Sequence, residues 1–192
     1  MKRARSTRPS DCPYVTKGGL KLEFALDAFN VNPNGCMAGD FGCHRGGFTH
    51  CLLLHGARHV HAIDTAYGVL DWSLRNDSRV TVHERTNLLH WTAPTPLDMI
   101  VLDTGWTPQH RSVPAALQSL NPNGTLLSLV KPQYEASRSE CVRGVLRPER
   151  IEPTLHAVRE RLSPIVDIVG EACSPLLGSG GNVETWLHLR PR

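Results

Sequence analysis

The sequence CMAGDFGCHRGGF, residues 36–48, decides the fold. It begins with a short apolar run that ends at Asp40, passes through a turn containing Gly42 and Gly46, and leads at Phe48 into a segment with helical character. This order predicts a strand, a tight glycine turn and a helix, an arrangement in which the backbone can approach a nucleoside closely. We expect the ligand at the point where the strand ends.

The glycine spacing narrows the class of ligand. Gly42, Gly46 and Gly47 fit G-x-x-x-G-G rather than the G-x-G-x-x-G of dinucleotide dehydrogenases, so no pyrophosphate is required over the helix start. A pocket for S-adenosylmethionine fits this spacing better. The alternative is an ordinary glycine-rich turn that binds nothing.

The composition predicts one soluble domain. The chain has 192 residues, of which 40% are hydrophobic and 20% are charged, enough for one sizeable core. No apolar run approaches the ~20 residues that span a bilayer, and the first residues lack an apolar signal core. We therefore expect a cytoplasmic protein without a membrane partner. The six cysteines show no C-x-x-C spacing, which favours reduced thiols.

The first residues form a basic arm. Residues 1–13 contain several lysines and arginines and two prolines but few apolar residues, so we expect poor order in the free protein and a folded domain over residues 14–192. Such an arm commonly contacts phosphates, and it is as often only a solvated tail.

Strand and helix patterns alternate after the arm, which predicts an α/β fold with a mainly parallel sheet. Strands are expected at 38–40, 60–64, 80–87, 97–103 and 124–130, with a closing pair within 165–189. Helices are expected at 20–29, 48–55, 67–77, within 106–120, and at 151–162, where Pro153 is expected in the first turn. Residues 121–124 read as a turn, and 137–150 as an irregular basic excursion.

Charged residues gather at the predicted strand ends. Asp40, Asp64, Asp103 and Lys131 each follow an apolar strand. The closing pair suggests a hairpin whose last strand runs antiparallel, so that Glu184, at its start, would lie at the same edge. In open α/β sheets this edge is the ligand site.

Lys21 is unusual because it falls on the apolar face of the predicted helix 20–29. Residues placed ~100° apart put Glu23 and Asp27 on the other side of that helix. A buried, unpaired lysine is costly. Either the side chain snorkels from the first turn to water, or this face borders a pocket that contains carboxylates.

Six motifs in this order carry a resemblance to a known family. They are YVTKGGLKLEFALDAF (14–29), GDFGCHRGGFTHCLL (39–53), AIDTAYGVL (62–70), HERTN (83–87), VKPQYEA (130–136) and SPLLGSGGNVETWLHL (174–189). The sequence resembles the hemolysin A/TlyA group of the FtsJ-like RNA methyltransferases over residues 14–190. The resemblance implies a Rossmann-like fold with a seven-stranded sheet and helices on both faces. It also implies S-adenosylmethionine as cofactor and transfer of a methyl group to a ribose 2′-hydroxyl of ribosomal RNA.

The resemblance also implies site residues. Enzymes of this kind use a Lys-Asp-Lys-Glu tetrad, which falls on Lys21, Asp103, Lys131 and Glu184. The cofactor residues implied are Asp40, Gly42, Gly46, Phe48, Asp64 and Asn87. Among these, Asp64 is expected at the ribose hydroxyls and Asn87 near the adenine.

A tetrad of this kind suits the chemistry. A ribose hydroxyl is a weak nucleophile that must lose its proton as the methyl group transfers, so a base is needed near neutral pH, whereas a free lysine with a pKa of ~10.4 is mostly protonated. Burial and a second ammonium both lower the pKa of a lysine. We therefore expect Lys131 to be the general base, with its pKa lowered by Lys21.

The sequence departs from this family at three places. Relatives usually carry a small RNA-binding domain before the core, and here about a dozen basic-arm residues stand in its place. His44 and Arg45 replace small residues in the cofactor loop and could crowd the pocket. Residues 104–111, TGWTPQHR, differ from the expected turn on the substrate side.

Two further groups of residues have alternative interpretations. A cluster of histidines and cysteines within 43–61 suggests a metal, but two of its members lie in the expected cofactor loop, so we expect no metal site. Arg138, Arg143, Arg147 and Arg150 are a candidate RNA-facing patch, or else a solvated loop.

Two other classes of function are alternatives. A non-catalytic RNA-binding or ribosome-associated module is favoured by the changed cofactor loop and opposed by the intact tetrad. A membrane-damaging activity is disfavoured, because the sequence contains no amphipathic or apolar segment suited to a bilayer.

Overall fold

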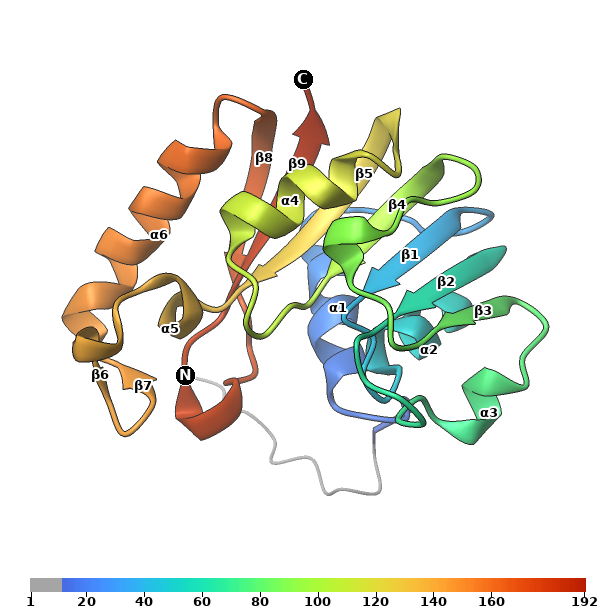
Figure 1. Cartoon of the computed structure of the whole chain (residues 1–192), viewed down its shortest axis with the longest axis horizontal. Coiled ribbons are helices and arrows are strands. Elements are labelled where there is room, and N and C mark those ends of the chain that lie inside the picture. Colours follow the sequence, from blue (N-terminus) through green and yellow to red (C-terminus); the bar gives the residue numbers. More distant parts are fainter. Residues whose placement is uncertain (1–11) are drawn as a thin grey trace.

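The structure, a computed structural model, describes residues 12–192. The expected basic arm therefore lies almost entirely outside the described residues. The chain forms one seven-stranded sheet in the order β3-β2-β1-β4-β5-β9-β8 and a separate two-stranded sheet, β6-β7 (Figure 1). The strands are β1 (Met37–Phe41), β2 (His59–Ile63), β3 (Val80–His83), β4 (Leu97–Leu102), β5 (Leu120–Val130), β6 (Cys141–Val142), β7 (Val145–Leu146), β8 (Val166–Cys173) and β9 (Thr185–Pro191).

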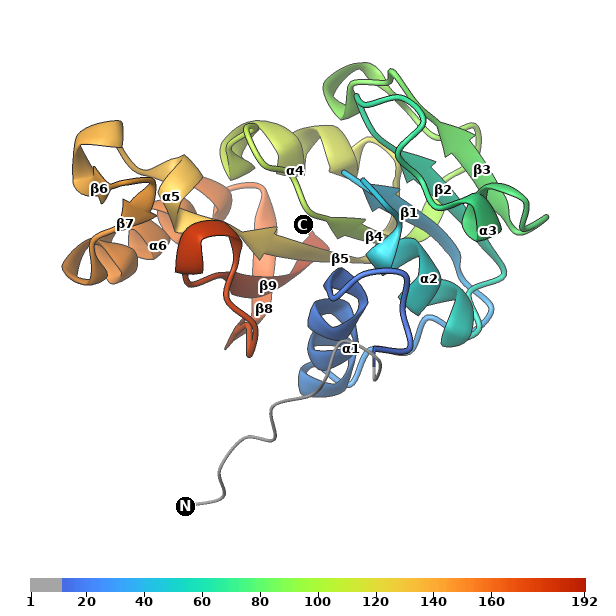
Figure 2. The same ribbon diagram turned by 90° about the horizontal axis from the view of Figure 1, so that it is seen from below.

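Helices cover both faces of the large sheet. The α-helices are α1 (Gly18–Ala28), α2 (Gly47–Leu54), α3 (Trp72–Arg75), α4 (Gln109–Leu117), α5 (Pro132–Glu135) and α6 (Pro148–Leu162). Short 3-10 turns are η2 (Leu88–His90), η3 (Arg138–Glu140) and η4 (Ser179–Gly181). Figure 2 shows α1 and α2 on one face and α4 and α6 on the other. The predicted three-layer α/β architecture is confirmed.

The direction of the strands agrees with the sequence pattern. β1 pairs in parallel with β2 and β4, β2 with β3, and β4 with β5. β9 is antiparallel to both of its neighbours, β5 and β8. The carboxyl ends of the parallel strands and the start of β9 therefore meet at one edge of the sheet, as predicted.

Each face of the sheet has its own core. Leu127 and Leu129 on β5 pack with α1 and α2, whereas Leu126 and Val130 pack with α4 and α6. This alternation follows from the two-residue period of a strand. Because both faces are covered, β4 and the second half of β5 are buried almost throughout.

Three elements differ from the sequence-based expectation. The predicted turn 121–124 lies within β5, because the register moves from Leu97–Leu120 to Met99–Thr125 and the extra residues bulge out between the two pairs. β3 ends at His83 rather than near residue 87. The predicted helix 67–77 shrinks to α3, because the loop before it is held by side-chain oxygens and helical structure starts only after its N-cap, Asp71.

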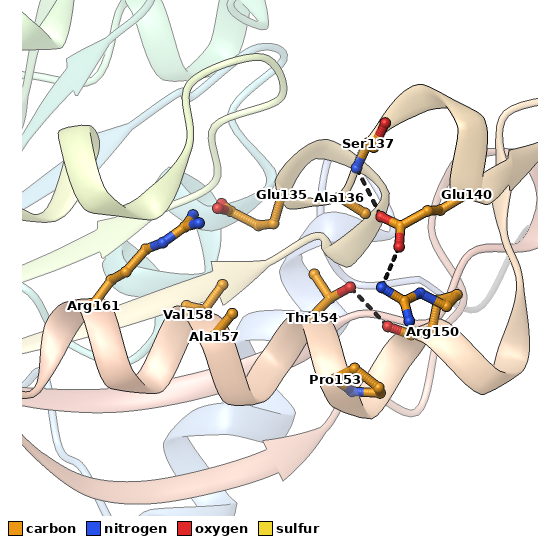
Figure 3. Close-up of a pocket in the computed structure, with 10 residues that line it drawn as sticks. All are labelled: Glu135, Ala136, Ser137, Glu140, Arg150, Pro153, Thr154, Ala157, Val158 and Arg161. Carbon is orange, nitrogen blue, oxygen red and sulfur yellow. Dashed lines mark hydrogen bonds and ion pairs between the residues drawn. The ribbon is translucent and has the colours of Figure 1, made fainter.

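The segment expected to be irregular, 137–150, is ordered. Residues 141–146 form the β6-β7 hairpin. α6 begins earlier than predicted, with Pro148 rather than Pro153 in its first turn. Figure 3 shows the junction with α6, where Glu140 accepts a hydrogen bond from the backbone N–H of Ser137 (2.9 Å) and pairs with Arg150.

A pair of histidines lies on β2 and β3, on the face of the sheet that α4 covers. Nδ1 of His61 on β2 is 3.0 Å from Nε2 of His83 on β3, and both rings lie against Trp91. Burial, together with the neighbouring His83 and His59, lowers the pKa of His61 to about 4. His61 is therefore neutral in the folded protein at neutral pH.

This pair predicts a loss of stability in mild acid. The folded-state pKa of His61 lies below the ordinary 6.5, so its contribution is present above pH 6.5 and is lost as the pH falls towards 4. Between pH 6.5 and 5 the free energy of unfolding should fall by about 2 kcal/mol. His61→Gln should flatten this dependence in urea unfolding, and His110→Gln, at an exposed position on α4, should not. An unchanged slope in His61→Gln would contradict the assignment.

Candidate functional site

A cavity with a volume of about 830 Å³ opens at the carboxyl ends of β1, β2, β4 and β5. It lies where the strand order reverses, with β2 on one side of β1 and β4 on the other, which is the usual ligand position in open α/β sheets. Its volume suits a ligand of the size of a nucleoside cofactor. The predicted residues that line it are Gly42, Asp64, Asn87, Asp103 and Lys131.

Gly42 joins β1 to β4 at the floor of this cavity. Its φ is +93°, in the left-handed region, and a Cβ at this position would lie 2.4 Å from the backbone carbonyl oxygen of Asp103. Only glycine fits such a contact without displacing the end of β4. Gly42 thereby brings the cofactor turn and Asp103 together.

Asp64 and Asn87 form the rim beyond β2. The Asp64 carboxylate accepts hydrogen bonds from the backbone N–H of His44 (2.7 Å) and of Ala66 (2.8 Å). Each of its oxygens retains a lone pair, so the carboxylate can still accept from a vicinal diol. The Asn87 side-chain oxygen caps η2 by accepting from the N–H of Leu89 (3.0 Å).

Asp40, Gly46 and Phe48 do not line this cavity. Asp40 is fully buried and accepts hydrogen bonds from the N–H and hydroxyl of Thr49 (2.8 and 2.7 Å). Burial raises the pKa of Asp40 to about 7, against the lowering by Thr49. Gly46 approaches α3, and Phe48 packs against Trp186 and borders a smaller adjoining hollow. These three residues hold the turn in place from behind.

The unusual loop residues leave the cavity open. His44 lines the cavity wall, with φ at +45°. Arg45 is exposed and extends towards Asp71, 4.0 Å away. The crowding that the sequence suggested therefore does not close the pocket.

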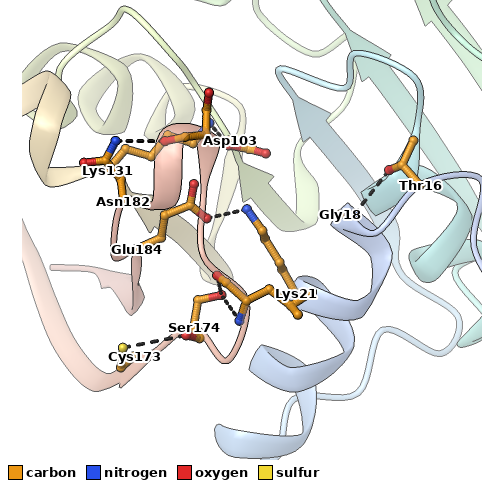
Figure 4. Close-up of polar contacts among 11 residues, drawn as sticks. Thr16, Gly18, Lys21, Asp103, Lys131, Cys173, Ser174, Asn182 and Glu184 are labelled. Atoms are coloured by element: carbon orange, nitrogen blue, oxygen red, sulfur yellow. Dashed lines mark hydrogen bonds and ion pairs between the residues drawn. The ribbon is translucent and has the colours of Figure 1, made fainter. Parts of the chain in front are cut away.

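The four tetrad residues are brought together from four elements. Lys21 on α1 lies 2.5 Å from Glu184, just before β9, and Lys131 at the end of β5 pairs with Asp103 at the end of β4. Figure 4 shows these side chains converging on one space. Lys21 is partly buried and paired, so its charge on the apolar helical face is compensated by the Glu184 carboxylate.

Glu184 depends on a close backbone approach. Its side chain is 2% exposed, and a Cβ on Gly178 would lie 2.0 Å from its Oε1. The backbone carbonyl of Glu184 accepts from the N–H of Ser174 (2.9 Å). The glycine-rich loop before β9 is thus shaped around this carboxylate.

The sequence did not indicate a role for Trp106, an aromatic residue at the cavity, or for Tyr134, which lies against it. Trp106 is 82% exposed, lines the cavity, and lies with its ring centroid 5.0 Å from that of Tyr134. Trp106 could have been noticed in the sequence because it lies three residues after Asp103, in the segment 104–111 that departs from the family pattern.

Comparison with known proteins shows to which family this chain belongs. The FtsJ-like methyltransferase family model matches residues 14–190. This chain belongs to the FtsJ-like methyltransferase family. The match confirms the predicted family, the fold class and S-adenosylmethionine as cofactor.

Two curated relatives and one solved structure resemble this FtsJ-like chain over most of its length. YqxC of Bacillus subtilis is 37% identical over 190 residues, which are 92% of this chain and 65% of the relative. The 16S/23S rRNA (cytidine-2′-O)-methyltransferase TlyA of Mycobacterium tuberculosis is 38% identical, with 94% of this chain and 70% of the relative covered. A protein of Streptococcus thermophilus described as a candidate hemolysin superposes with a TM-score of 0.91 at 32% identity, covering 96% of this chain and 69% of that one. The chain thus spans about two thirds of the length of these proteins.

Metal-binding and membrane-spanning features are absent from the described part of this FtsJ-like chain. Over residues 12–192, no three His, Cys, Asp or Glu side chains are grouped so as to hold a metal ion. In the same range, no helix has the length and apolar character to cross a membrane.

The charge state of Lys131 differs from the expectation. Burial by itself would lower the pKa of this lysine, but the carboxylates of Asp103 and Glu184 outweigh burial, and the net pKa is raised. The predicted lowering of the Lys131 pKa is therefore wrong. The reason is that Lys21 is paired with Glu184, which neutralises its charge beside Lys131.

The rim carboxylate gives a binding prediction for this FtsJ-like domain. Titration with S-adenosylhomocysteine should give saturable heat, and Asp64→Ala should weaken binding by about tenfold to a hundredfold, as expected for a lost charged hydrogen bond. Asp167→Ala, an exposed carboxylate on β8, is the matched control. Equal affinity of Asp64→Ala and the wild type would exclude Asp64 from the nucleoside contact.

Proposed function

We propose that this chain transfers a methyl group from S-adenosylmethionine to a ribose 2′-hydroxyl of ribosomal RNA. The observation that carries the proposal is the pair of lysine–carboxylate contacts, Lys131–Asp103 and Lys21–Glu184, beside the cofactor cavity. When bound, S-adenosylmethionine would supply an electrophilic methyl group, whose S–C bond breaks as the new O–C bond forms, and the neutral thioether that leaves needs no acid. The protein must supply a proton acceptor and hold the hydroxyl in line.

Lys131 is the proposed general base. Its neutral amine would take the hydroxyl proton as the new O–C bond forms, and the resulting ammonium would be stabilised by the Asp103 carboxylate beside it. The raised pKa means that the resting enzyme holds this lysine mostly as the ammonium. Activity should therefore rise with pH through the alkaline range until the neutral amine predominates.

Asp40, Gly46 and Phe48 take a supporting role in this proposal. They form or brace the turn that carries Gly42, while Gly42, Asp64 and Asn87 provide the surface towards the cofactor. This division follows from which of the six residues border the large cavity.

Ribosomal RNA as the acceptor is supported by two observations. The relative TlyA is named as an rRNA 2′-O-methyltransferase. In addition, the exposed Trp106 packed on Tyr134 offers an aromatic surface at the cavity mouth, and unpaired bases commonly stack on such surfaces.

Tritium transfer tests the function directly. Wild-type protein with labelled S-adenosylmethionine and total ribosomal RNA should incorporate label into a nucleoside methylated on the ribose. Label on a base would replace the proposal with a base methyltransferase. Binding of cofactor and RNA without any transfer would favour the non-catalytic RNA-binding module.

Removal of the proposed base gives a quantitative prediction. Lys131→Ala should lower kcat by about 10² to 10⁴, the usual contribution of general base catalysis, and leave S-adenosylhomocysteine affinity nearly unchanged. Lys17→Ala, at an exposed position before α1, is the control and should keep full activity. Normal turnover by folded Lys131→Ala would rule out this lysine as the base.

We expect Lys21 to act by changing the electrostatic environment, and so the pKa, of Lys131. Lys21→Ala leaves Glu184 free to interact with Lys131, which should raise the pKa of that lysine further and shift the pH–rate profile to higher pH. Glu184→Gln should shift the profile in the opposite direction, because one of the carboxylates that stabilise the ammonium is removed. Profiles of both variants that coincide with the wild type would show that the Lys21–Glu184 pair has no electrostatic role.

A further inference from the structure

The β6-β7 hairpin is a small sheet of its own, outside the seven-stranded sheet (Figure 1). Its two strands share two pairs, Cys141–Leu146 and Val142–Val145. An isolated hairpin of this size has little stability in water, so its position must be fixed by contacts with the rest of the protein. Two such contacts are present, one from the active-site loop and one from α6.

Asn182 provides the contact from the active-site loop. Its side chain, 4% exposed, accepts from the N–H of Leu146 (3.0 Å) and donates to the carbonyl oxygens of Gly144 (3.0 Å) and Ser179 (2.8 Å). Ser179 lines the cofactor cavity, and Asn182 is two residues before Glu184 (Figure 4). One buried amide thus joins the hairpin to the segment that carries a tetrad residue.

Glu140 provides the contact from α6. Its carboxylate pairs with Arg150 in the first turn of that helix (Figure 3), and its carbonyl oxygen accepts from the N–H of Arg147 (3.2 Å). The hairpin is therefore held at both sides, and its tip has a fixed direction relative to Glu184.

The tip itself carries an arginine in an unfavourable conformation. Arg143 and Gly144 have φ of +49° and +81°, the pattern of a two-residue type I′ turn. Asn or Gly is preferred at the first position of such a turn, and a long side chain there is strained. Strained residues that persist are often retained for a function.

Charge identifies the class of partner. Arg138, Arg143 and Arg147 are exposed, and none of them pairs with a carboxylate within residues 12–192. Arg150, by contrast, is paired with Glu140. Three of the four arginines that the sequence suggested as a patch are thus available to an anion, and the fourth fixes the hairpin.

We propose that the β6-β7 hairpin is a phosphate clamp, in which Arg143 at the tip binds the RNA backbone next to the reactive ribose and Asn182 keeps the tip in register with Glu184. This inference rests on the proposed function. The partner chemistry is a row of phosphates rather than a particular base, because a guanidinium on a hairpin tip can reach backbone oxygens without reading sequence.

The substitution Arg143→Asn separates function from folding. Asn is favoured at this turn position, so the urea midpoint of unfolding should rise or stay equal. The affinity for a 20-nucleotide single-stranded RNA should fall by threefold or more, and the slope of log affinity against log salt should decrease by about 0.7, the loss of one phosphate contact. Arg58→Ala, an exposed arginine just before β2 at the opposite edge of the sheet, is the control and should change neither quantity.

A double-mutant cycle tests the role of Asn182. If Asn182 acts by holding the hairpin, Arg143→Ala should weaken RNA binding in the wild type and have little further effect in the Asn182→Ala background. Additive losses would contradict positioning by Asn182. Unchanged affinity and salt slope in Arg143→Asn would overturn the clamp.

These outcomes are distinguishable from failure of the proposed function. If the wild type methylates ribosomal RNA but Arg143→Asn has the wild-type KM for total ribosomal RNA, the clamp is wrong and the enzyme assignment stands. If the clamp is right, Arg143→Asn should raise that KM with kcat nearly unchanged, because the contact acts on binding and not on the reacting atoms.

Discussion

The close contact between Gly42 and the backbone of Asp103 is the constraint on which the site depends. It joins the ends of β1 and β4 at the point where the strand order reverses, and a side chain at Gly42 would separate them. The same contact opens the cavity beside the glycine turn and puts Asp103 within reach of Lys131. The close approach of the Gly42 and Asp103 backbones thus fixes both the cofactor turn and the candidate catalytic carboxylate. Asp40 and Phe48 pack behind this turn and support it.

The second organising interaction is the separate pairing of the two lysines. Two ammonium groups close together would repel each other and favour loss of a proton, but here each faces its own carboxylate. The raised pKa of Lys131 is the consequence. The proposed base is thus stabilised as the ammonium, and we expect the charge at Glu184 to influence how readily it becomes the neutral amine.

The molecule combines a partly buried candidate reaction site with exposed groups suited to a large anion. Glu184 is buried and Lys21, Asp103 and Lys131 are partly buried, whereas Trp106 and Arg143 at the tip of the β6-β7 hairpin are exposed. Asn182 links the two regions through three hydrogen bonds. The Asn182 amide therefore connects the hairpin proposed to bind RNA with the segment that carries Glu184.

The sequence by itself determined the α/β class and the antiparallel last strand, because strand periodicity is local. Its resemblance to the family selected Lys21, Asp103, Lys131 and Glu184 as the proposed tetrad, and Lys21 also stood out as a lysine on an apolar helical face. It could not determine the register shift in β5, which depends on β4, or the short α3, which depends on side chains that hold the loop after β2. It also misjudged Lys131 and missed the hairpin and Asn182. Those features arise from contacts between residues far apart in the chain, and only the tertiary structure decides which charges and amides become neighbours.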